Sequence, residues 1–200
     1  MLTTANKLIV IMLFAIFANA CGEKNADFPI EFDSETAFEN LASIAKTNPR
    51  HSGSQGALET VLLIERKLSE TGIPYSRIEW EENTPTGKIT FRNIVVRIEI
   101  HEKLPWIILG SHYDTKHLGD MPKFQGANDG ASGVAILMEA AKIVWENKSK
   151  IRKNLEVVFF DGEECYFQYS NNDGLHGSKK HLESIKKEKR PVKAVVIADM

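Results

Sequence analysis

The sequence has little cysteine, no excess of charge of either sign, and no long apolar run beyond its first twenty residues. Its 200 residues include 2 cysteines, 25 lysines and arginines, and 27 aspartates and glutamates, which gives a formal net charge of -2. Near-balanced charge offers no electrostatic case for a nucleic acid or an acidic membrane surface as the main partner. With so few cysteines, stability must come from an apolar core rather than from a disulfide framework.

Several catalytic signatures are also missing. The chain contains no Gly-x-Ser-x-Gly elbow, no phosphate loop and no His-Glu-x-x-His helix. The sequence therefore gives no support for a serine hydrolase of the elbow type, a P-loop nucleotide enzyme or a metalloprotease of the helical-motif type.

The first twenty residues follow the pattern of an export signal. Lys7 precedes the apolar run "LIVIMLFAIFANA", which ends in small residues and is too short to span a bilayer. We therefore predict a signal peptide over 1–20. Cys21 follows directly, as in a bacterial lipoprotein whose lipidated cysteine becomes the amino terminus, and 21–33 reads as a tether. The expected location is the periplasm or outer membrane, with a plain cleaved signal and secretion as the alternative.

From Ser34 onward the pattern is that of one globular α/β domain over 34–200. Ser34 is expected to cap the first helix. Apolar periodicity predicts helices at 34–46, 55–71, 132–146 and 177–189, and strands at 75–80, 89–100, 105–110, 155–160 and 192–198. Alternating strands and helices predict a three-layer α/β/α fold with a mixed, mainly parallel central sheet.

Acidic residues and one histidine follow the predicted strands. In sheets of this kind, ligands bind beyond the carboxyl ends of the strands. Three strand ends and one glycine-rich loop before a helix would bring together His112 and Asp114, Asp129, Asp161 with Glu163 and Glu164, and Asp199. Carboxylates gathered at a buried strand end repel one another unless a cation neutralises them.

Imidazole and carboxylate ligands together suit zinc, and carboxylates can bridge two ions. Asp114 can accept the second ring N–H of His112 and orient it, although a turn-forming acid is the alternative. Of the adjacent residues Glu163 and Glu164, one can bind the metal while the other faces the substrate as proton carrier. The other histidines are predicted to have surface or structural roles in loops or on polar faces: His51, His101, His117, His176 and His181.

Four segments, "SHYDT", "GANDGASG", "FFDGEE" and the strand ending in Asp199-Met200, together resemble the M28 zinc peptidases and the related glutaminyl-peptide cyclotransferases. The resemblance runs from about residue 42 to the end. It implies one or two zinc ions, Glu163 as the acid–base residue and Asp114 as the residue that orients His112. It implies these metal ligands: His112, Asp129 (bridging when two ions are present), Glu164 and Asp199.

The segment "CYFQYSNNDGLH" after the glutamate pair resembles the cyclotransferases, and favours an enzyme that forms pyroglutamate from the N-terminal glutamine of a peptide or protein. Against that, "GANDGASG" is shared with ordinary peptidases, and Tyr169 stands where cyclotransferases tend to carry tryptophan. A zinc aminopeptidase is therefore the alternative, and an exported binding protein without catalysis is a third hypothesis. Because the family supplies another metal-binding histidine downstream, we expect the sequence to be the N-terminal part of a longer protein.

Overall fold

The computed structural model describes residues 31–119 and 124–199. The expected signal peptide and Cys21 lie outside these residues. The elements in chain order are α2 (Ser34–Lys46), α3 (Gln55–Glu70), β1 (Ser76–Thr84), β2 (Gly87–Ile98), β3 (Trp106–His112), η1 (Ala127–Ser132), α4 (Gly133–Glu146), η2 (Lys148–Lys150), β4 (Asn154–Phe160), α5 (His176–Glu188) and β5 (Val192–Ile197). None of the helices in these ranges combines the length and apolar character that a membrane span requires.

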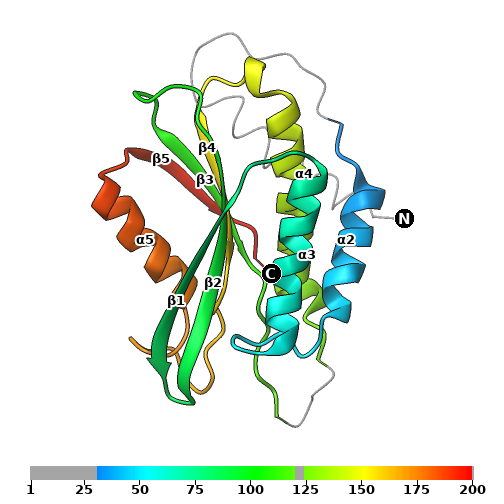
Figure 1. Cartoon of the computed structure of the whole chain (residues 1–200), viewed down its shortest axis with the longest axis vertical. Helices are drawn as coiled ribbons and strands as arrows, with labels where there is room; N and C mark the ends of the chain where they lie inside the picture. The colour runs from blue at the N-terminus through cyan, green and yellow to red at the C-terminus, as the bar shows by residue number, and fades with distance from the viewer. Residues whose placement is uncertain (1–30, 120–123, 200) are drawn as a thin grey trace.

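The five strands form one mixed sheet in the order β1-β2-β4-β3-β5 (Figure 1). β2 pairs antiparallel with both β1 and β4, whereas β3 pairs parallel with β4 and with β5. β3 and β4 are buried along their whole length, which explains why they read as continuous apolar runs rather than as alternating patterns. The predicted mixed sheet is confirmed.

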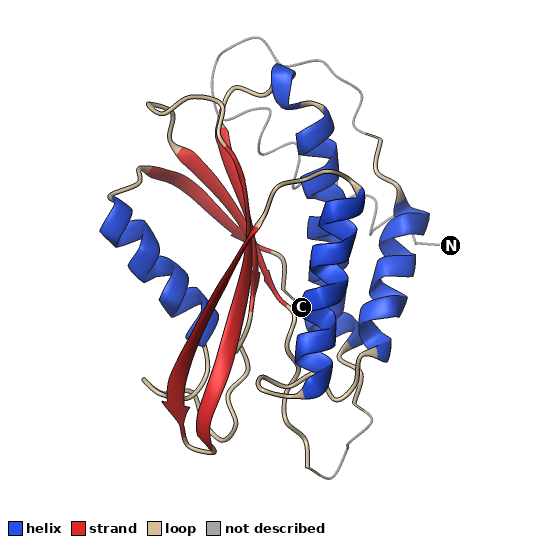
Figure 2. Cartoon of the chain, viewed as in Figure 1, coloured by secondary structure: helices blue, strands red, loops and turns tan. Residues whose placement is uncertain are grey.

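Helices cover both faces of this sheet (Figure 2). α2, α3 and α4 lie on one side, and α5 lies on the other. The larger apolar core fills the space between the sheet and the first three helices, with members from α3, α4, β2 and β4. A smaller cluster beneath α5 contains Val95, Ile108, Val158 and Phe160. The expected three-layer arrangement is therefore confirmed.

The start of α2 differs from the prediction. Asp33, not Ser34, is the capping residue, and its carboxylate accepts the backbone N–H of Thr36 at 2.9 Å. Ser34 is instead the first residue of the helix, one position beyond the cap. α3 begins at Gln55 as predicted and ends at Glu70, one residue earlier than predicted. Ser54 accepts the N–H of Ala57 at its start, and Gly72 has φ +68 just beyond its end.

The register of the parallel strands positions the site. His112, the last residue of β3, pairs with Phe160, the last residue of β4. On the other side of β3, Gly110 pairs with Ile197 of β5, and the N–H of Ala198 donates to the carbonyl of Gly110 at 2.8 Å. The three parallel strands therefore end at one edge of the sheet, where the motif residues follow them.

Candidate metal centre

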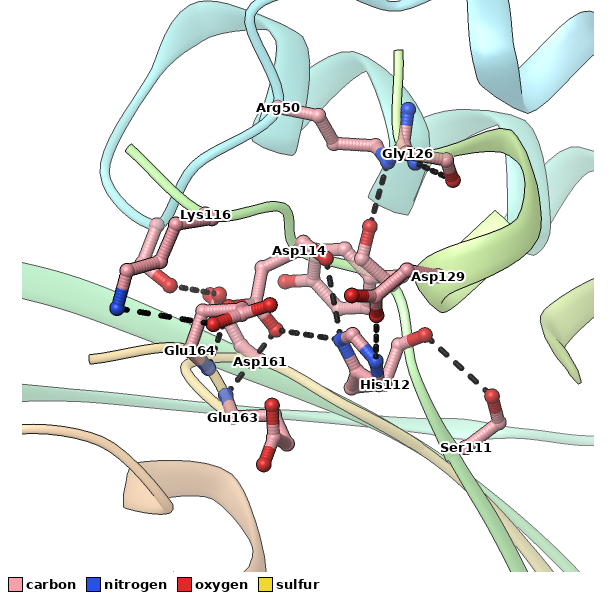
Figure 3. Close-up of polar contacts among 12 residues, drawn as sticks. Arg50, Ser111, His112, Asp114, Lys116, Gly126, Asp129, Asp161, Glu163 and Glu164 are labelled. Atoms are coloured by element: carbon pink, nitrogen blue, oxygen red, sulfur yellow. Dashed lines mark hydrogen bonds and ion pairs between the residues drawn. The ribbon is translucent and has the colours of Figure 1, made fainter. Parts of the chain in front are cut away.

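Three of the predicted ligands lie together at this edge. Nε2 of His112 is 3.0 Å from Oδ1 of Asp129 and 3.3 Å from Oδ1 of Asp199. One ligand atom from each of the three residues falls within 4.8 Å of the others. His112 is buried, while the two aspartates are partly exposed, so the cluster opens to solvent on its acidic side. Figure 3 shows His112 and Asp129 facing each other.

The loop that carries Asp129 depends on glycine. Gly130 has φ +91, and a Cβ atom there would lie 2.9 Å from the carbonyl oxygen of Asp114 and 3.2 Å from Cε1 of His112. Any larger residue would be strained in this conformation and would push the loop away from the imidazole ring. The glycines around Asp129 therefore let the backbone approach His112 closely.

The hydrogen bonding of His112 indicates which ring nitrogen faces the aspartates. Nδ1 lies 3.1 Å from the carbonyl oxygen of Asp114, which can only accept, so Nδ1 carries a proton. In the neutral ring, Nε2 then presents a lone pair. This atom is buried and has no hydrogen-bond partner among the described residues, yet it faces two carboxylates. A bound cation between them would satisfy all three groups, so the donor set fits a metal such as zinc.

The pKa values of the site also indicate an excess of negative charge. Burial alone would lower the pKa of His112, but Asp114 and Asp129 outweigh it and raise the pKa to about 11. The pKa of Glu164 is raised to about 7 by burial and by the neighbouring charge of Asp129. The protein groups alone thus leave the cluster with an excess of negative charge that attracts a proton or another cation.

Asp114 contacts both His112 and the glutamate pair. Its Oδ1 is 3.5 Å from Nδ1 of His112, and its carboxylate accepts the backbone N–H groups of Glu163 and Glu164 at 3.1 Å each. The sequence suggested that the Asp114 carboxylate would accept the ring N–H of His112; in the structure the backbone carbonyl of Asp114 is the nearer acceptor, at 3.1 Å. The contact with the glutamate pair was not predicted, because it depends on a turn whose shape the sequence does not reveal.

The two glutamates point in different directions (Figure 3). Glu164 lies near Lys116, whose Nζ is 3.8 Å from its Oε2, and it also interacts with Asp129. Glu163 instead faces Tyr169, whose hydroxyl is 3.4 Å from each carboxylate oxygen. Burial raises the pKa of Glu163, and the charge of His112 opposes that rise.

Asp161 does not join the cluster, although the sequence grouped it with the glutamate pair. It is buried, accepts the hydroxyl of Ser52 at 2.7 Å, and accepts the N–H of Arg92 at 2.9 Å. Burial and the nearby charge of Asp114 raise the pKa of Asp161 to about 7. Asp161 thus ties the end of β4 to distant segments, and only two carboxylates of this turn, those of Glu163 and Glu164, remain near the candidate metal centre.

Two histidines expected on polar faces are instead buried. His176 is 1% exposed, pairs through Nδ1 with Glu82 at 2.6 Å, and stacks on Phe91. His181 is 4% exposed, and its Nε2 lies 2.8 Å from Glu156. The prediction of an exposed position was wrong because polar partners on the neighbouring strands accommodate both rings beneath α5. The inferred structural role agrees with these contacts.

Sequence reasoning also passed over Lys116, which supplies positive charge beside the cluster. Its ammonium donates to Sγ of Cys165 at 2.9 Å and to the carbonyl oxygen of the same residue. Cys165 is buried next to the acidic turn. The available signal was position: Lys116 directly follows the "SHYDT" segment.

Comparison with known proteins places this site in a family. The model of peptidase family M28 matches residues 93–200, which include every candidate ligand. The chain belongs to this family. It is 30% identical over 132 residues to a glutaminyl-peptide cyclotransferase of Dictyostelium discoideum, covering 56% of this chain and 36% of that protein. It is also 30% identical over 144 residues to a glutaminyl-peptide cyclotransferase-like protein of Mus musculus, covering 68% and 37%.

Solved structures of related proteins share the fold of this M28 family member. A glutaminyl cyclase from an Acidobacteriales bacterium superposes with a TM-score of 0.74 at 26% identity, covering 90% of this chain and 63% of the other. A leucine aminopeptidase precursor from Bacteroides thetaiotaomicron superposes with a TM-score of 0.71 at 22% identity, which shows the common fold. The chain spans a little over a third of the length of the curated relatives named above.

Proposed function

We propose that the protein is a zinc-dependent enzyme of the glutaminyl-peptide cyclotransferase type, which converts an N-terminal glutamine into pyroglutamate and releases ammonia. The observation that carries this proposal is the similarity to proteins of that name across a region that holds the His-carboxylate cluster. The segment "CYFQYSNNDGLH" (165–176), which follows the glutamate pair and resembles the cyclotransferases, supports the same choice.

The metal would be held by His112, Asp129 and Asp199, with Glu164 next to Asp129 as a further ligand. When bound, zinc acts as a Lewis acid that polarises the side-chain amide of the substrate. The chain's own groups orient this site: the carbonyl oxygen of Asp114 fixes the His112 ring, and the glycines near Asp129 bring its carboxylate to Nε2.

Glu163 is the proposed proton carrier. As the substrate's α-amino nitrogen forms a bond to the side-chain amide carbon, the carboxylate of Glu163 accepts a proton from that nitrogen. It then returns the proton to the amide nitrogen as the carbon–nitrogen bond breaks and ammonia leaves. The turn of Glu163 is fixed by the Asp114 carboxylate, and the phenol of Tyr169 lies at equal distance from its two oxygens.

The reaction can be read directly from product masses. Full-length protein, loaded with zinc, is incubated with two peptides that differ only in an N-terminal glutamine or leucine. Loss of ammonia from the glutamine peptide alone, abolished by a chelator, supports the proposal. Release of a free N-terminal amino acid would indicate an aminopeptidase instead, and unchanged peptides with zinc bound would point to a binding protein.

We also propose that the protein is exported and anchored to a bacterial membrane through a lipid at Cys21, as the N-terminal pattern predicts. The test is fractionation of cells that express the full-length protein or its Cys21→Ala variant. The proposal expects the parent protein in the membrane fraction and the variant in the soluble exported fraction. An equal distribution of both would contradict the anchor.

A further inference from the structure

Arg50 is a fully buried arginine whose side chain forms no hydrogen bond to a carboxylate of the described residues. Its guanidinium donates three hydrogen bonds, all to backbone carbonyl oxygens: Nε to Tyr113 at 2.6 Å, Nη2 to Gly126 at 2.9 Å and Nη1 to Ile44 at 3.0 Å. Figure 3 shows Arg50 close to Gly126, above His112 and Asp129. Burying a charge for backbone contacts alone is costly, so the arrangement calls for a functional reason.

Two of the three carbonyls that Arg50 contacts belong to the loops that carry the candidate ligands, and the third, that of Ile44, belongs to α2. Tyr113 lies between His112 and Asp114 in the chain, and Gly126 begins the loop of Asp129. The carbonyl oxygen of Arg50 also accepts the N–H of Thr115 at 3.2 Å. One residue thus joins the loop after β3 to the loop before α4. The spacing between the imidazole and the Asp129 carboxylate depends on the relative position of these loops.

Only arginine suits this position. Its planar guanidinium presents donors in fixed directions, whereas a lysine ammonium is a single point on a flexible stem. Burial lowers the pKa of Arg50 to about 10, and Asp114 and Asp129 favour its charged form. The Gly126 loop closes around the group: at φ +51, a Cβ atom on Gly126 would lie 3.1 Å from Nη2 and 2.4 Å from Cγ2 of Thr115.

We propose that Arg50 is a positioning residue of the metal centre, which sets the separation between His112 and Asp129 by bonding the backbones of both loops. This inference rests on the metal centre of the proposed function and not on the identity of the substrate. It predicts that the geometry of the guanidinium, and not merely its positive charge, determines how tightly zinc binds.

The main test is the zinc affinity of full-length Arg50→Lys, measured by competition with a chromophoric chelator below the unfolding temperature. The variant keeps the charge but cannot reach three carbonyls at once. We expect binding to weaken about 10–100-fold, the range seen when residues that orient metal ligands are changed. The matched control is Arg190→Lys, because the side chain of Arg190 is also largely covered, at 9% exposed, but bonds Glu156 beneath α5. The control should lose stability and keep its zinc affinity.

A second variant covers the case in which Arg50→Lys does not fold. Arg50→Ala leaves a cavity that free guanidinium ion can enter, so added guanidinium at low concentration should restore zinc affinity, whereas sodium or ammonium should not. Wild-type affinity in Arg50→Lys, or equal rescue by ammonium, would contradict the inference.

The outcomes separate this inference from the proposed function. A parent protein that binds no zinc would contradict both. A parent protein that binds zinc, with weakened binding in Arg50→Lys, but forms no pyroglutamate would contradict only the proposed reaction and would support the role of Arg50.

Discussion

Strand β4 carries one buried acidic residue in its middle and an acidic turn at its end. The two differ in how far nearby cationic side chains balance their negative charge. Glu156 has no exposed surface. Its carboxylate oxygens lie 2.6 Å from a nitrogen of Arg97, 2.8 Å from a nitrogen of Arg190 and 2.8 Å from a nitrogen of His181. At the end of the strand, Glu163 and Glu164 lie near the cluster of His112, Asp129 and Asp199, and the positive groups nearby do not balance these carboxylates.

The pKa values of two glutamates express this difference. Burial alone would raise the pKa of Glu156, but hydrogen bonds from His181, Arg97 and Arg190 outweigh it and lower the pKa to about 2. The pKa of Glu164 rises to about 7, because burial and Asp129 both act against its charge. Two residues of the same type, eight positions apart, thus differ because cationic side chains surround Glu156, whereas the nearest strong influence on Glu164 is another carboxylate.

Among these substitutions, a change of Asp129 should have the largest effect on the acidic edge. If the acidic edge is a metal site, Asp129→Asn should weaken zinc binding at least about 100-fold, beyond the usual effect of changing residues around the ligands, and should abolish zinc-dependent activity. Isothermal titration of the full-length protein measures the affinity. Glu156→Gln is the control, since its cluster lies beneath α5 and should leave zinc binding unchanged. Undiminished binding in Asp129→Asn would remove this residue from the ligand set.

Glu163 should separate catalysis from metal binding within the acidic edge. Loss of a positioned proton carrier typically slows a reaction by about 10²–10⁴-fold, so Glu163→Gln should reduce kcat by that amount and still bind zinc. Steady-state kinetics with an N-terminal glutamine peptide, together with metal analysis, give both quantities. Glu183→Gln on the exposed face of α5 is the matched control and should behave as the parent protein. Retained activity in Glu163→Gln would exclude the assigned role.

Glu156 should show the opposite profile, with a loss of stability and no loss of metal. Removing its charge leaves two arginines and a histidine partly unpaired beneath α5, which typically costs about 3–5 kcal/mol. Urea unfolding of Glu156→Gln measures this loss. Glu70→Gln removes an exposed ion pair to Arg66 and should change stability by less than about 1 kcal/mol. Equal effects of the two substitutions would show that the buried cluster does not stabilise the fold.

The contribution of Glu156 to stability should depend on pH. The pKa of Glu156 is lower in the folded protein, at about 2, than its ordinary value of 4.5. Its contribution is therefore complete above about pH 4.5 and is lost as pH falls through about 2, by about 3 kcal/mol in total. The difference in unfolding free energy between the parent protein and Glu156→Gln should shrink over that window. A constant difference would contradict the lowered pKa.

Much of the fold could be predicted because its signals are local. Apolar runs identified β3 and β4, and the strand ends correctly located the motif residues at one edge. The sequence could not distinguish Asp161 from its neighbours, because its partner Ser52 is 109 positions away. The burial of His176 likewise depends on Glu82 and Phe91, which a reading of α5 alone does not include.

The order of residues in the chain is enough to tell which chemical groups follow each parallel strand, since hydrophobic periodicity specifies where strands end and parallel pairing aligns those ends. Where those groups point depends on the folded chain. Asp161 turns inward, Glu163 and Glu164 turn apart, and Arg50 reaches the carbonyls of two ligand loops. Side-chain directions in irregular turns are set by contacts with distant segments, and those contacts exist only after the chain has folded.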